Sequence, residues 1–172
     1  MDVGTRKVAS VDDGIVVLYS GLAADSRVLT RKAQECCLGY RGKFGDGARV
    51  PVSTLVSEVA LVMQEYTHMA GVRPFGVALL VASAEAHGAG RLYRIEPSGT
   101  YSAWRACAIG KGSAKAEAIL QEEFQEAMDR ESAVELVLSV ILRCTPQTIS
   151  REDVEIAFVE GGALEVKTRK ET

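Results

Sequence analysis

The order of strand-like and helix-like segments predicts an α+β fold, a four-layer αββα sandwich of two antiparallel sheets flanked by helices. Along the 172 residues, two strand patterns precede a helix pair, a run of hairpins, a second helix pair and a last hairpin. Helix pairs between groups of hairpins predict layered antiparallel sheets, whereas regular strand-helix alternation would predict a parallel sheet. Because 47% of the residues are hydrophobic, the chain can bury one sizeable core, and we expect a single domain over residues 1–172.

Residues 1–21 are predicted to form strands. The run Ile-Val-Val-Leu-Tyr at 15–19 is short, apolar and rich in β-branched residues, and Ser20 and Gly21 close it. This is typical of a buried strand. A weaker strand is expected over residues 5–11.

Residues 22–70 are predicted to form a helix, a loop and a second helix. Apolar residues recur at near-helical spacing from Leu22 to Tyr40, and Asp25 near the start suits the positive end of the helix dipole. Glycines at positions 39, 42, 45 and 47 predict the loop. Pro51 suits the first turn of the second helix, whose apolar residues between 52 and 66 follow three-and-four spacing.

Residues 73–110 are predicted to form antiparallel hairpins. Arg73-Pro74 marks a strand entry, because proline pushes the preceding residue toward extended geometry. Strands are expected at 75–83, 92–95, 101–104 and 106–109, with a turn containing His87 at 87–90 and another at 97–99.

A helix pair is predicted at 113–145 and a hairpin at 153–166. Ser113 is expected to cap the first helix, and Ser132 with Glu135 forms a capping-box pattern for the second. Thr145-Pro146 should end that helix, and Gly161-Gly162 should turn the hairpin. The tail at 167–172 is polar and expected to fray.

Composition argues against several classes of partner and ligand. The net charge of −3 gives no positive field to attract nucleic acid or an anionic membrane. No apolar run approaches the roughly 20 residues of a membrane span, so we expect an intracellular protein. The four cysteines lack paired spacing and only two histidines are present, so we expect buried, reduced thiols and neither metal nor cofactor.

Candidate catalytic groups are better explained as structural ones. The segment Gly110-Lys111-Gly112-Ser113 fails the phosphate-loop pattern, since Arg105 stands where the first glycine belongs, and a tight strand-to-helix turn is favoured. His68 has no nucleophile set beside it by any motif. Glu122, Glu123 and Glu126 are expected on a solvated helix face, and Tyr101 and Trp104 in the sheet core or an interface.

Three segments carry a family resemblance over nearly the whole chain. They are Met63 to Gly76, with its run Arg73, Pro74, Phe75 and Gly76; the hairpin with Pro97, Ser98, Gly99 and Trp104; and the turn Gly110, Lys111 and Gly112. In this order and spacing they resemble the alpha-type subunits of the 20S proteasome core particle, whose fold is the same four-layer sandwich as that of N-terminal nucleophile hydrolases.

The resemblance implies a non-catalytic alpha-ring subunit that supports ubiquitin-dependent and other intracellular protein degradation in the cytoplasm and nucleus. Its partners would be neighbouring alpha subunits and the beta ring, partly through residues 22–70, and the regulatory particle on the outer face. Catalytic relatives use an N-terminal threonine. Thr5 lacks the sequence context of that threonine, so no catalytic residue is assigned. Alpha subunits also carry a gating tail, a short helix and about two strands before the matched part, so we expect a truncated form.

Two other functions fit the same fold. An N-terminal nucleophile hydrolase would expose a processed threonine, serine or cysteine, which a nucleophile-directed inhibitor would label. A free-standing interaction module would stay monomeric and bind no ring partners.

Overall fold

The computed structural model describes residues 6–84, 90–145, 154–160 and 163–168. Two antiparallel sheets form its centre. The larger has the order β1-β2-β3-β4-β5, with β1 at Val8–Asp12, β2 at Ile15–Gly21, β3 at Val77–Ser83, β4 at Arg91–Ile95 and β5 at Tyr101–Trp104. The smaller pairs β6, Glu155–Glu160, with β7, Ala163–Thr168. Thr5, His87, Pro146, Gly161 and Gly162, for which a role was predicted, lie outside the described residues.

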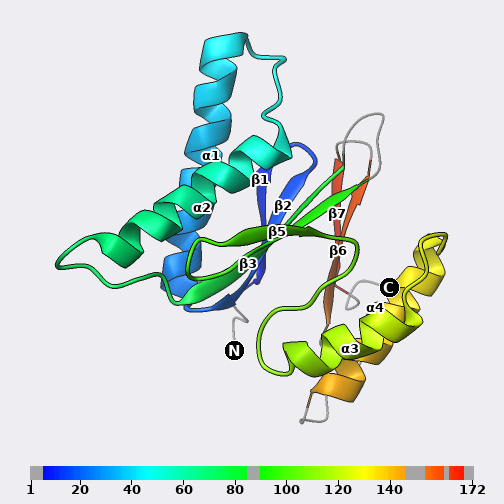
Figure 1. The fold of residues 1–172 in the computed structure, drawn as a ribbon. Coiled ribbons are helices and arrows are strands. Elements are labelled where there is room, and N and C mark those ends of the chain that lie inside the picture. The colour runs from blue at the N-terminus through cyan, green and yellow to red at the C-terminus, as the bar shows by residue number, and fades with distance from the viewer. Residues whose placement is uncertain (1–5, 85–89, 146–153, 161–162, 169–172) are drawn as a thin grey trace, which may run out of the picture.

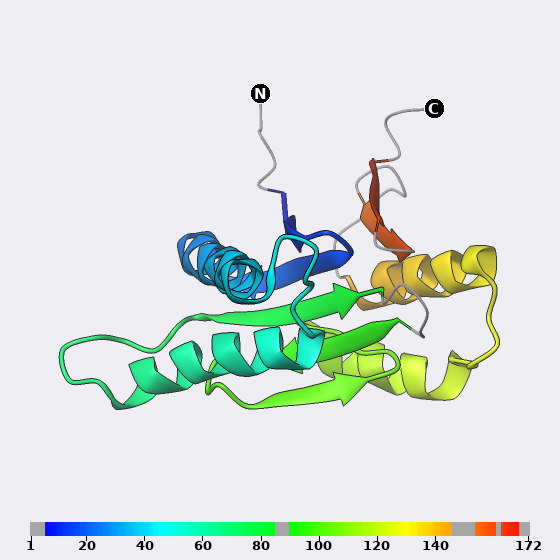
Figure 2. The same ribbon diagram turned by 90° about the horizontal axis from the view of Figure 1, so that it is seen from above.

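Two helix pairs flank the strands (Figure 1). The pair on one side is α1, Ala23–Phe44, and α2, Val52–His68; on the other side lie α3, Ser113–Glu123, and α4, Arg130–Cys144. Seen from above, the hairpin β6–β7 stands next to α4 (Figure 2). The predicted α+β class, antiparallel sheets with helices outside, is confirmed.

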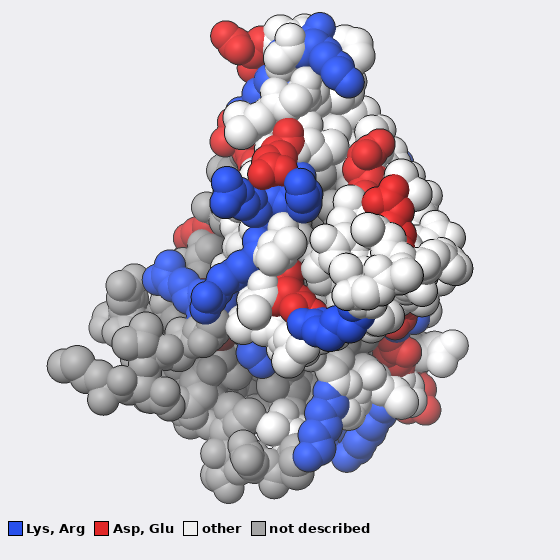
Figure 3. Space-filling view, turned by 90° about the vertical axis from the view of Figure 1, so that its left-hand side faces the viewer, with Lys and Arg blue, Asp and Glu red and all other residues white. Residues whose placement is uncertain are grey.

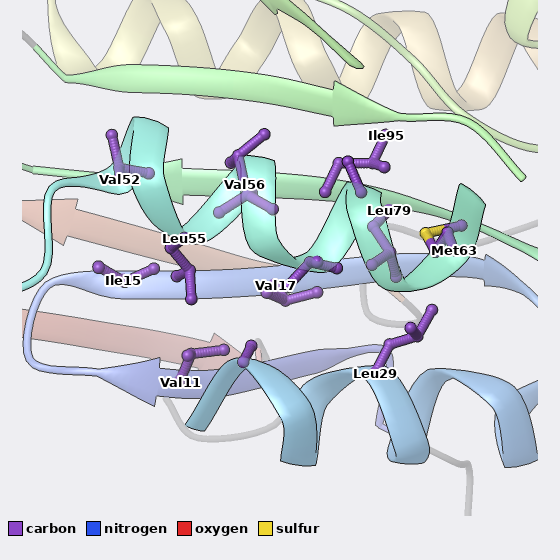
Figure 4. Close-up of a cluster of buried hydrophobic side chains, with 14 of the residues drawn as sticks. Val11, Ile15, Val17, Leu29, Val52, Leu55, Val56, Met63, Leu79 and Ile95 are labelled. Carbon is purple, nitrogen blue, oxygen red and sulfur yellow. The ribbon is translucent and has the colours of Figure 1, made fainter. Parts of the chain in front are cut away.

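The main core fills the space between α1, α2 and one face of the five-stranded sheet (Figure 4). Alternation places Val77, Leu79 and Val81 of β3 on this face, all fully buried. They meet Leu29 of α1 and Met63 of α2, neither of which has any exposed surface. Each strand presents every second side chain to this core, and each helix presents side chains that are three or four residues apart. Both kinds of element therefore offer the core a continuous apolar surface.

α1 is longer than the glycines predicted. Gly39 and Gly42 lie inside the helix, and the chain leaves it only at Gly45, whose φ of 99° is left-handed. A helical glycine costs about 1 kcal/mol relative to alanine. The buried stripe of Leu29, Ala33 and Cys37 outweighs that cost, so packing prevails over local propensity at this site.

Both predicted helix caps are wrong by position. α3 takes Gly112 as its N-cap, with a φ of 85°, and Ser113 is its first helical residue. α4 begins at Arg130, because the Asp129 carboxylate accepts the Ser132 backbone N–H at 2.9 Å. Ser132 therefore supplies a donor within the first turn and is not the cap.

Three smaller expectations are corrected. The strand predicted at 106–109 is wrong: these residues are irregular chain that connects β5 to α3 without pairing with a strand. β7 continues to Thr168, so part of the predicted tail is strand. Tyr101 and Trp104 are 45% and 37% exposed, so the sheet-core alternative is wrong, while the interface alternative stays a prediction. Among the strands that the structure describes, β5 lies at the edge of its sheet and pairs on one side only.

Candidate functional site

The segment Arg73 to Gly76 is fastened to the start of α1 by one carboxylate. Asp25, only 6% exposed, accepts two hydrogen bonds of 2.7 Å from the Arg73 guanidinium. It also accepts the Gly76 backbone N–H at 2.8 Å. The Arg73 guanidinium holds the pKa of Asp25 below its ordinary value, against the opposing effect of burial, and the Gly76 N–H adds to the lowering. We call this arrangement the Asp25 latch.

The latch depends on close backbone contact at the entry to β3. The Leu22 N–H donates to the Gly76 carbonyl at 3.0 Å, and a Cβ at Gly21 would lie 2.3 Å from that same oxygen. Gly21 has a φ of 126°, so both space and backbone conformation demand glycine. Phe75, beside it, is 7% exposed and packs on Tyr66 with ring centroids 4.6 Å apart. The whole segment thus joins α1, α2 and β3.

The predicted turn at Pro97, Ser98 and Gly99 connects β4 to β5 beneath α2. The Gly99 N–H donates to the Glu96 carbonyl at 2.9 Å, and the Glu96 N–H donates to the Thr100 carbonyl at 2.8 Å. Gly99 has a φ of 82°, and a Cβ there would lie 2.6 Å from the Ala60 carbonyl oxygen of α2. Glycine at this position lets the turn approach the helix.

Trp104 belongs to a polar cluster at the outer strand of the sheet. The Arg94 guanidinium lies 4.5 Å from the centre of its ring, and its indole N–H donates to Ser102 Oγ at 2.7 Å. Arg94 also pairs with Glu117 of α3 and, at 2.8 Å, with Glu96. This cluster ties the sheet to α3, so Trp104 covers an ion pair that links two layers.

The turn Gly110, Lys111 and Gly112 opens α3, as the tight-turn interpretation predicted. Gly110 and Gly112 have φ of 96° and 85°, and the Ser113 N–H donates to the Gly110 carbonyl at 3.1 Å. A Cβ at Gly110 would lie 2.5 Å from Ser20 Oγ of β2, so the turn seats closely on the sheet. The Lys111 side chain is exposed.

The described residues hold no group of three or more histidine, cysteine, aspartate or glutamate side chains placed to bind a metal ion. Cys37 is buried, as predicted, whereas Cys36, Cys107 and Cys144 are only partly buried. Burial raises the pKa of Cys37 to about 12 and that of Cys107 to about 11, so both stay protonated thiols near neutral pH. His68 is exposed at the last position of α2.

The outer surface of α1 and α2 carries exposed apolar side chains among charged ones. Val28 and Leu38 of α1 are 47% and 64% exposed, and Leu61 of α2 is 50% exposed. Lysine and arginine side chains spread over the face seen in Figure 3, with acidic groups between them. Single exposed apolar side chains are common on protein surfaces, and a protein partner can bury them. None of the helices among the described residues is long and apolar enough to span a membrane.

The sequence predictions and the structure coincide only in part at this site. Arg73, Pro74, Phe75 and Gly76 form one unit, while Trp104 and the two glycine turns lie in separate places and form no common pocket. Asp25 was missed as their partner, because its position in the first turn already had a helix-dipole explanation. Only two signals in the sequence pointed to this pairing: an aspartate in the first turn of one helix, and an arginine before a strand entry marked by proline.

Known proteins match most of this chain. Residues 1–159 match the family described as proteasome subunit. A proteasome subunit alpha type-2 from Trypanosoma brucei brucei is 36% identical over 95% of this chain and 69% of its own length. One from Oryza sativa subsp. indica is 35% identical over 92% and 66%, and one from Saccharomyces cerevisiae is 36% identical over 89% and 61%. The chain therefore spans about two thirds of the length of these relatives.

Proposed function

The chain belongs to the proteasome subunit family, and on that premise we propose that it is a structural, non-catalytic alpha-ring subunit of the 20S core particle. The observation that carries the proposal is its similarity to relatives named alpha type-2 along nearly its whole length. The subunit would form part of the ring and contact its neighbours in a particle that degrades ubiquitin-marked and other proteins.

The chemistry of the described residues supports a role without bond cleavage. An activated nucleophile needs a neighbouring base or a lowered pKa. Cys37 and Cys107 have raised pKa values, caused by burial, which is the opposite of activation. The exposed imidazole of His68 makes no hydrogen bond to a serine or cysteine side chain within the described part of the chain, so it activates no nucleophile there.

The outer surface of α1 and α2 supports contact with neighbouring alpha subunits and the beta ring. Its exposed apolar residues Val28, Leu38 and Leu61 would be buried in such contacts. Docking of a regulatory particle on the outer face, and residence in both cytoplasm and nucleus, belong to the same proposal and rest on family membership.

Native mass spectrometry of this chain co-expressed with other alpha-type subunits tests the proposal, because it reports partner identity and stoichiometry together. We expect mixed rings that contain the chain. Leu38→Asp should reduce its incorporation, whereas Leu142→Asp, at a 36% exposed position on α4, should not. A monomer that joins no ring, or labelling of the chain itself by a threonine-directed inhibitor, would contradict the assignment.

A further inference from the structure

We draw no further inference here: the strongest candidate, the surface patch of Tyr101 and Trp104 on strand β5, carries none, because nothing in the part of the chain that the structure describes shows what covers these two exposed rings.

Discussion

At the residue scale, Asp25 determines how α1 meets the first strand that follows α2. Its carboxylate is buried, but the arginine that pairs with it is largely exposed, so the aspartate is the partner whose loss matters more. Removing a charged acceptor leaves the Gly76 N–H without its partner inside the fold. The energetic cost therefore comes from the unpaired donors more than from a surface ion pair.

We expect Asp25→Ala to lower the free energy of unfolding by about 2–4 kcal/mol, because three hydrogen bonds to a carboxylate are lost. Urea denaturation measures this, with Asp46→Asn in the exposed loop after α1 as the control. The difference between the wild type and Asp25→Ala should also depend on pH. Since the pKa of Asp25 is lowered in the folded state, its contribution is complete above the ordinary 3.8 and is lost as pH falls through the lower folded value. A difference that stays constant down to pH 2 would contradict this assignment.

Cys37 predicts a loss of stability in alkaline solution. Burial raises its pKa from 9.0 to about 12, so between these values the unfolded chain loses a proton that the folded chain keeps. The free energy of unfolding should therefore fall by up to about 1.4 kcal/mol per pH unit from this thiol alone. Cys37→Ala should show a shallower decline than the wild type above pH 9, measured by urea titration at each pH. Parallel curves for the two proteins would show that the thiol titrates freely.

At the scale of elements, the sequence predicts the strands and helices well where apolar periodicity is strong. β2, β3 and α2 lie within two residues of their predicted positions, because their side chains alternate or repeat in a pattern that burial then enforces. The end of α1 was missed, since glycines signal a loop locally whereas packing of residues further back sustains the helix. The N-cap of α4 was predicted wrongly because Asp129 and Ser132 are both residue types that cap helices. Which of them is the cap depends on where the backbone becomes helical, and this is not visible in the sequence.

The candidate site was predictable only as separate motifs. Proline and glycine at 74, 76, 97, 99, 110 and 112 marked real turns and strand entries, because their conformational limits are local properties. Which of these motifs share a partner depends on tertiary structure, and Asp25 with Arg73 is separated by 48 residues.

Replacement by alanine should change the stability of the protein in opposite directions at Gly42 and Gly99. Gly42 lies in α1, and a Cβ added there would meet nothing within 4 Å, so Gly42→Ala should stabilise the protein by about 0.5–1 kcal/mol through helix propensity. Gly99→Ala should destabilise it by more than about 1 kcal/mol, because φ is 82° and the new Cβ would lie 2.6 Å from a carbonyl of α2. Thermal unfolding followed by circular dichroism measures both. A stabilising Gly99→Ala would mean that the turn does not touch α2.

At the scale of the whole molecule, the protein has two hydrophobic clusters, which differ in how completely their side chains are buried. The first joins α1, α2 and the five-stranded sheet, and several of its side chains have no exposed surface. The second, between α3 and α4, contains Ala116, Ile119, Leu120, Leu136 and Val140, each between 5% and 9% exposed. A cleft of about 870 Å³, lined by Leu18 and Leu80 of the sheet and by Leu120 and Val140 of the second cluster, lies between the two, so these parts of the fold share little packing.

This division predicts two groups of amides in native-state hydrogen exchange. Amides of β2 and β3 should exchange only through global unfolding, because both strands are paired on both edges and lie on the larger core. Amides of β6, β7 and α4 should exchange at least about tenfold faster, since local opening there breaks the smaller cluster and a single strand pair. Mass spectrometry of peptic fragments resolves these segments, and uniform exchange across all of them would mean that the two clusters unfold as one cooperative unit.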